Sequence, residues 1–221
     1  MRCSEEPTRS RSFSPPTPRI QGPKRSVTIS VRPATPRDRA AVGEILARGF
    51  PEKFRPIFGR DPLRTARILA ELPPAGRVYV AERDGQVVGT LTLVLDSRPQ
   101  GPIWPVLRRH LSWGRALWAL LMLLVLGSGT PEQDTALIEA VAVLPEQRGQ
   151  GIGRALMERA LAEAHRAGKR RAALYVVEDN VPARRLYESL GFRVERRTGL
   201  AWARPLFGAR RVLYMVKDLS P

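Results

Sequence analysis

The sequence has little of what metal and disulfide sites require. Its 221 residues include one cysteine, Cys3, and two histidines, His110 and His165, which lie far apart. A single cysteine excludes a disulfide framework within the chain, and the histidine spacing matches no zinc motif, so we expect no metal site. Cysteine usage this low fits the cytoplasm, which is the localisation we expect.

Long apolar runs and aromatic side chains are scarce as well. The longest continuous apolar stretch, Ala116 to Leu126, has 11 residues, whereas a membrane-spanning helix needs about 20. We therefore expect no membrane span. Aromatic residues make up 6% of the chain, so the stacking platforms that bind single-stranded nucleic acid are not indicated.

Basic residues outnumber acidic ones, 37 to 21, and give a formal charge of +16. Such a charge favours a polyanionic partner, which a nucleotide cofactor, a nucleic acid or an anionic membrane would supply. Arginines scattered over solvated faces explain it equally well. Because no nucleic-acid-binding motif accompanies the charge, we expect no specific nucleic acid partner.

The chain divides into a tail and one domain. Residues 1–26 are rich in proline, serine and arginine and show no periodicity, so we expect a disordered basic tail ahead of a domain at 27–221. Strands are expected at 27–32, 77–83, 87–95, 136–143, 172–177, 192–195 and 211–217, and helices at 35–50, 63–72, 103–128, 151–167 and 182–190. This order predicts a mixed α/β (α+β) fold.

Residues 103–128 form the least ordinary segment. They combine arginines with the short apolar run, so we expect a helical insertion, within about 97–130, that packs on its own domain. A homodimer contact and an interfacial membrane contact stay open as alternatives.

A glycine-rich turn joins the strand at 136–143 to the next helix. Glycines let the backbone approach a ligand, and the first N–H groups of a helix lack internal partners, so the turn suits a pyrophosphate. No Gly-Lys-Ser/Thr of a P-loop is present, and the Gly-x-Gly-x-x-Gly of a dinucleotide site fails at Leu156. A turn that serves tight packing alone remains an alternative. The turn consists of Arg148, Gly149, Gln150, Gly151, Ile152 and Gly153.

The complete pattern resembles the GCN5-related N-acetyltransferase (GNAT) superfamily. Arg148, Gly151 and Gly153 match its Arg/Gln-x-x-Gly-x-Gly/Ala signature after a strand. A second segment matches the family's Asn-x-x-Ala-x-x-x-Tyr-x-x-x-Gly-Phe run through Asn180, Ala183, Tyr187, Gly191 and Phe192. The resemblance is strong over 135–195 and weaker over 27–96, and it does not cover the tail or 97–130.

The resemblance implies a central, mostly antiparallel sheet, flanked by helices and splayed at the strand before the glycine turn. Acetyl-CoA would be the cosubstrate, its pantetheine pairing with the backbone of Val141 and Val143 and its pyrophosphate lying on the N–H groups of the turn. A primary amine, on a small molecule or a protein, would attack the thioester directly without a covalent enzyme intermediate.

Direct aminolysis needs a deprotonated amine and a donor for the leaving thiolate. Tyr187 is the family-matched donor, or else a core tyrosine. Glu139 interrupts an apolar strand and is the candidate base through water, unless it faces solvent; Glu178 is a weaker candidate. Asn180 resembles the family's cofactor-contacting asparagine and also suits a helix N-cap. A non-catalytic acyl-CoA-binding sensor is the alternative function.

Overall fold

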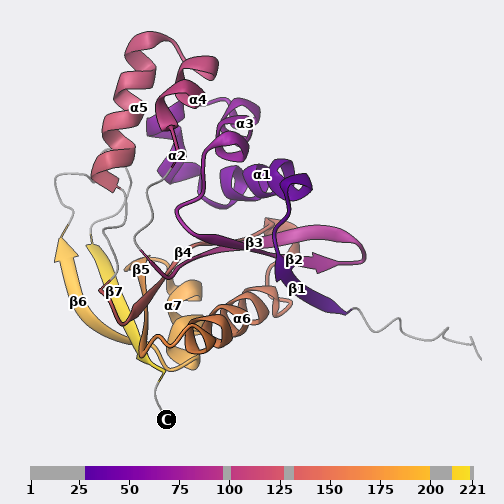
Figure 1. Cartoon of the computed structure of the whole chain (residues 1–221), viewed down its shortest axis with the longest axis vertical. Helices are drawn as coiled ribbons and strands as arrows, with labels where there is room; N and C mark the ends of the chain where they lie inside the picture. Colours follow the sequence, from indigo (N-terminus) through magenta and orange to yellow (C-terminus); the bar gives the residue numbers. More distant parts are fainter. Residues whose placement is uncertain (1–27, 97–100, 127–131, 200–210, 220–221) are drawn as a thin grey trace, which may run out of the picture.

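A seven-stranded sheet forms the centre of the protein. The computed structural model describes residues 28–96, 101–126, 132–199 and 211–219 (Figure 1). The strands run in the order β1-β2-β3-β4-β5-β7-β6, and every neighbouring pair is antiparallel except β4 and β5. This confirms the mixed, mostly antiparallel fold. Their bounds are β1 Ile29–Pro33, β2 Arg77–Arg83, β3 Gln86–Val94, β4 Thr135–Val143, β5 Arg171–Val177, β6 Arg193–Gly199 and β7 Arg211–Asp218.

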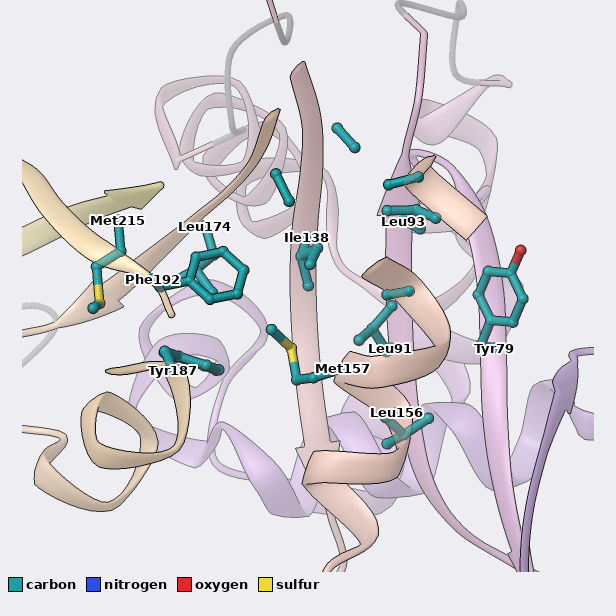
Figure 2. Close-up of a cluster of buried hydrophobic side chains, with 14 of the residues drawn as sticks. Tyr79, Leu91, Leu93, Ile138, Leu156, Met157, Leu174, Tyr187, Phe192 and Met215 are labelled. Atoms are coloured by element: carbon teal, nitrogen blue, oxygen red, sulfur yellow. The ribbon is translucent and has the colours of Figure 1, made fainter. Parts of the chain in front are cut away.

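Helices cover both faces of this sheet. Figure 1 shows α6 and α7 on one face and α1, α2 and α3 on the other, with α4 and α5 beyond them. The main core lies between α6, α7 and the sheet, and Figure 2 shows part of it, with labelled residues from Tyr79 to Met215. The helices are α1 Arg39–Gly49, α2 Pro51–Phe58, α3 Pro62–Glu71, α4 Ile103–His110, α5 Trp113–Leu126, α6 Ile152–Arg166 and α7 Val181–Ser189.

Two helical features differ from the sequence-based expectations. Helix α2 was not predicted, since its prolines at positions 51 and 56 disfavour a helix interior; Pro51 instead occupies the first turn, and Phe54, Ile57 and Phe58 are buried. The single helix expected over 103–128 is two helices, because the backbone of Leu111 is extended and ends α4. Gly127 and Ser128 lie outside the described residues.

Strands β2 and β3 form an antiparallel hairpin joined by a two-residue turn. Asp84 and Gly85 both have positive φ, 50° and 77°, as the two-residue turn between right-handedly twisted strands requires. Leu72 and the following Pro73 and Pro74 end α3, also as expected.

Strands β4 and β5 part halfway along their length. They are paired from Thr135 to Ile138, the latter opposite Leu174. Beyond that point β5 keeps its partner β7 as far as Val177, while β4 keeps its partner β3 as far as Val143. One side of β4 is therefore without a strand partner from Glu139 onward, which confirms the expected splay.

A β-bulge lies in β4 at the same place. Thr90 is opposite Ala142 and Thr92 is opposite Glu139, so two residues of β4, Ala140 and Val141, face a single residue of β3. Ala140 has φ of 49°, in the left-handed region that non-glycine residues rarely adopt. Because successive side chains alternate in a strand, the extra residue puts both Glu139 and Ala142 on the face that carries α1.

A charged cluster fixes the start of the α1 segment to the sheet edge. Arg32 of β1 donates to both carboxylate oxygens of Asp38, at 2.7 and 3.0 Å, and also bonds Glu82 of β2. The bond from Arg32, helped by the backbone and hydroxyl of Thr35, holds the pKa of Asp38 far below its usual range. This cluster positions one wall of the concavity described below.

The α4–α5 insertion packs on its own domain, as expected, but leaves one stripe exposed. Ala116 and Ala119 are fully buried against the cluster formed by α2, α3 and α4. Four apolar side chains on another side of α5 face solvent: Trp113, Leu117, Leu121 and Leu124. Among the described helices, none has the length and apolar character to cross a membrane.

We predict that Gly43→Ala destabilises the fold. A Cβ at this position would lie 2.3 Å from the carbonyl oxygen of Ala66 and 2.9 Å from the Cβ of Ala70, so α1 and α3 would have to separate. Overpacking of this kind costs about 1–3 kcal/mol. Thermal and urea unfolding should show the loss.

The matched control is Gly114→Ala in the first turn of α5. An added Cβ there meets nothing within 4 Å, and alanine is the better helix former, so stability should stay level or rise by up to about 1 kcal/mol. Equal melting temperatures for Gly43→Ala and the wild type would show that the α1–α3 contact is not tight.

Candidate active site

The glycine turn lies between β4 and α6 and exposes a row of backbone N–H groups. Gly149 and Gly151 adopt φ of 75° and 81°. The bond from the N–H of Ala155 to the carbonyl of Gly151, 3.0 Å long, begins the α6 ladder. The N–H groups of Ile152, Gly153 and Arg154 precede it, so they have no partner within the helix and lie at its positive end.

The three glycines of the turn have different structural roles. An added Cβ at Gly149 or Gly151 would meet nothing within 4 Å, so these two leave open space beside the N–H groups. A Cβ at Gly153 would lie 3.3 Å from Leu186, so this glycine lets α7 approach α6. The packing alternative thus holds for Gly153, while at Gly149 and Gly151 the left-handed backbone and the open cradle fit an anionic ligand.

Polar side chains hold the turn in place. Arg148 donates from Nε to the carbonyl of Val143 at 3.3 Å, and Gln150 donates to the carbonyl of Glu146 at 3.4 Å. Arg154 donates to the hydroxyl of Ser189 at 2.6 Å and so ties α6 to the end of α7. The two arginines thus flank the open N–H groups in the sequence.

The free side of β4 presents unpaired backbone. Leu144 donates its N–H to the carbonyl of Val88, and neighbouring residues of a strand direct their backbone groups to opposite sides. The N–H and carbonyl of Val143 therefore face the gap left by β5. The carbonyl already accepts from Arg148, which leaves the N–H for a ligand. Val141 lies within the bulge, two residues earlier.

Tyr187 lies on the same side of the sheet as the glycine turn. It is 8% exposed and packs edge-on against Phe192, with ring centroids 6.1 Å apart. Figure 2 shows it reaching from α7 towards Met157. Burial raises the pKa of its hydroxyl to about 12, so this group stays protonated and can donate at neutral pH.

Asn180 caps the helix that carries Tyr187. Its side-chain oxygen accepts from the N–H of Ala183 at 3.3 Å, which confirms the N-cap interpretation. Glu178, the weaker candidate base, forms ion pairs with Arg197 and Arg211 at 3.8 and 3.5 Å. These partners compensate the charge of its carboxylate.

The other face of the sheet carries a large concavity of about 860 Å³. Its floor is a single row across the strands, in which Val78 is opposite Thr92 and Thr92 is opposite Glu139. Helices α1, α2, α3 and α5 supply mostly aliphatic walls. A volume of this size suits a small organic molecule. Glu139, half-buried, therefore lines a hollow rather than facing open solvent.

Lys53 of α2 lines the same concavity, and sequence reasoning missed it. The side chain as a whole is exposed, but its ammonium group is shielded by protein, and this desolvation lowers its pKa. The charge of Glu139 opposes that shift. No sequence signal identified Lys53, because α2 itself was not predicted and a lone lysine carries no pattern.

The gap in the sheet joins the two halves of the site. Glu139 is the first residue of β4 beyond its last pair with β5, Ile138 opposite Leu174. On one face lie the glycine turn and Tyr187, and on the other lie Glu139 and Lys53. In the described part of the chain, no group of histidine, cysteine or acidic side chains could hold a metal ion.

Comparison with known proteins agrees with this architecture. The model of the Acetyltransferase (GNAT) family matches residues 40–192, more than half of the chain. N-alpha-acetyltransferase 40 of Saccharomyces cerevisiae is 33% identical over 147 residues, 62% of this chain and 44% of the relative. Mycothiol acetyltransferase of Frankia alni is 31% identical over 182 residues, 79% of this chain and 46% of the relative.

Solved structures show the same fold. An acetyltransferase-fold protein from Salmonella typhimurium, solved with its cofactor acetyl-CoA, matches with a TM-score of 0.55 at 23% identity, over 87% of this chain and 94% of that one. The chain spans less than half the length of the two curated relatives. The fold and the family match together place this chain in the GNAT family of acetyltransferases.

We predict that Gly151→Val abolishes acetyl-CoA binding. A valine there would fill the open cradle, and its Cβ would project beside the N–H groups. Its branched side chain is also strained at a positive φ, by roughly 1–2 kcal/mol. Calorimetry should show loss of binding while the protein stays folded.

The control variant needs a valine at another glycine with positive φ, away from the turn. Gly168, after the end of α6, has φ of 73° and open space around its Cβ position. Gly168→Val should lose similar stability and keep its acetyl-CoA affinity. Equal affinities for both variants would exclude the turn as the binding site.

Proposed function

We propose that this chain is an acyl-CoA-dependent N-acyltransferase that transfers the acetyl group of acetyl-CoA to a primary amine. The observation that carries the proposal is the gap between β4 and β5. It opens beside a cradle for an anion on one side and beside a carboxylate-bearing concavity on the other. Transfer between two ligands that approach from opposite faces of a sheet needs such an opening.

In this proposal the glycine turn holds the pyrophosphate on the N–H groups from Gly149 to Arg154. The N–H of Arg148, which the family resemblance included, already donates to the carbonyl of Pro145. The pantetheine arm lies along the free side of β4, where Val143 offers its N–H and Val141 its bulged backbone. Asn180, besides capping α7, contacts the arm. Acetyl-CoA supplies an activated thioester, and the protein supplies alignment, an oxyanion donor from the strand backbone, and proton transfer.

Proton transfer has two sites. A primary amine has a pKa near 10.4 and reaches the site mostly protonated, so it must lose a proton before it attacks. Glu139 would accept that proton through water, at the place where the concavity meets the gap. Tyr187 would donate its proton or a hydrogen bond to the departing thiolate, since burial keeps its hydroxyl neutral.

The curated relatives support acyl transfer but differ in acceptor. One is named an N-alpha-acetyltransferase and the other a mycothiol acetyltransferase. The test is release of free thiol from acetyl-CoA by the purified protein against a panel of amines, amino acids and peptides. Turnover with any of them supports the proposal. Tight acetyl-CoA binding with no thiol release across the panel would favour the non-catalytic sensor.

We predict that Tyr187→Phe lowers kcat by about 10- to 10⁴-fold, the range for a lost general acid, without weakening acetyl-CoA binding. Phenylalanine keeps the ring against Phe192, so the melting temperature should hold. Because the pKa of Tyr187 is raised to about 12, its ionisation should produce no decline in wild-type activity below about pH 11. An unchanged kcat where chemistry limits the rate would leave Tyr187 a core residue.

We predict that Glu139→Gln lowers kcat/KM by about 10²- to 10⁴-fold near neutral pH. The deficit should shrink as the pH approaches the pKa of the acceptor amine, since the free amine then needs no base. Glu178→Gln is the control, because that carboxylate is held by Arg197 and Arg211. Similar pH–rate profiles for the two variants would exclude Glu139 as the base.

A further inference from the structure

The ammonium of Lys53 is a desolvated cation with little compensation. It projects into the concavity from α2 and lies 5.7 Å from the ring centroid of Phe54. Burial lowers its pKa, and Glu139 counteracts this through its charge. Within the described residues, no ion pair or hydrogen bond joins Lys53 to a carboxylate. An anion placed beside this ammonium would remove much of the desolvation penalty.

Glu139 presents the opposite charge in the same hollow. Its carboxylate forms no ion pair in the described part of the chain, and it lies at the gap where a thioester would be presented. Lys53 and Glu139 therefore influence each other across the concavity through their charges, without an ion pair between them. A ligand that carries both charges close together could bridge them.

The rest of the hollow is largely apolar. Its lining beyond Lys53, Glu139 and Thr92 includes Val42 and Leu46 of α1, Leu69 and Leu72 of α3, and Ile103, Leu123 and Leu124 of the insertion. Arg39 adds a second positive charge, and it is exposed. A polycationic amine would bring charges that Arg39 and Lys53 repel, and its polar chain would gain little from these walls.

We propose that the acceptor is an apolar α-amino acid or a similar zwitterionic amine, with its carboxylate on Lys53 and its amine towards Glu139. This inference rests on the proposed function and specifies its substrate class. Lys53 thereby selects acceptors with an anionic group beside the reactive nitrogen. The aliphatic walls receive the side group.

The experiment compares two acceptors and three variants by kcat/KM. L-leucine and 3-methylbutylamine share the same branched chain and differ by the carboxylate. Lys53→Met removes the charge and keeps the apolar length, and Lys53→Arg keeps the charge. Arg55→Met removes a charge from the same helix outside the concavity. Dividing each variant's leucine-to-amine ratio by the wild-type ratio cancels the difference in basicity between the two amines.

Lys53→Met should lower kcat/KM for leucine by about 10- to 100-fold, as loss of a hydrogen bond to a charged group does. The value for 3-methylbutylamine should stay level or rise. Lys53→Arg should retain much of the leucine preference, and Arg55→Met should leave the ratio unchanged. The leucine effect should appear mainly in KM, because the contact is made before the chemical step.

Three results would overturn the inference. The first is an equal loss for both acceptors in Lys53→Met. The second is a wild-type enzyme that does not use leucine but acetylates 3-methylbutylamine. The third is a wild-type enzyme that acetylates only the N-terminus of a peptide with an amidated carboxyl end. Each leaves N-acyl transfer intact, whereas failure to acetylate any amine, with acetyl-CoA bound, would overturn the proposed function itself.

Discussion

The structure depends on one interruption of backbone hydrogen bonding. β4 and β5 pair through Ile138 and then separate, so one side of β4 has no strand partner in the middle of a sheet. Buried backbone groups without partners are costly, and sheets normally avoid them. Here the exposed strand side lies between the glycine turn on one face and the concavity on the other. The separation thus costs backbone hydrogen bonds and leaves a free strand side between these two features.

The bulge at Ala140 shapes the face of the sheet that carries α1. A residue other than glycine in the left-handed region costs of order 1–3 kcal/mol, which the surrounding packing must offset. The neighbouring row is well supported: Thr90 and Ala142 are buried beneath α1, and Gly49 lets that helix approach Ala142 closely. The strained backbone of Ala140 is therefore held by well-packed neighbours. In return, Glu139 faces the hollow instead of the main core.

Much of the fold could be predicted because its signals are local. The Asp84-Gly85 turn, the glycine turn and the Asn180 cap each involve a few successive residues whose backbone needs are specific. The splay followed from the family resemblance and not from the strand sequence, since Ala136–Val143 gives no sign of where its partner leaves. The left-handed Ala140 is imposed by tertiary packing and has no local signature.

The concavity was beyond sequence reasoning for the same reason. Helix α2 begins at Pro51 and contains Pro56, and its stability comes from burying Phe54 and Phe58 rather than from propensity. Burial lowers the pKa of Lys53, and the charge of Glu139, 86 positions further along the chain, opposes that shift. The sequence places Arg148 and Arg154 in or beside the glycine turn. It does not predict that they bond to Val143 and Ser189, because those contacts depend on the tertiary structure.

The extra residue in β4 also determines how insertions and deletions in this strand would change the site. In a strand with strict alternation, Glu139 and Ala142 would face opposite sides of the sheet. Deleting the extra residue would therefore exchange the lining of the hollow with that of the core. A substitution at Glu139 changes a single side chain. An insertion or deletion in the strand instead moves every later side chain to the opposite face of the sheet. A change in the length of this strand therefore alters the site more than a single substitution does. Relatives whose aligned residues are offset by one at this strand should be expected to place different side chains against their acceptors.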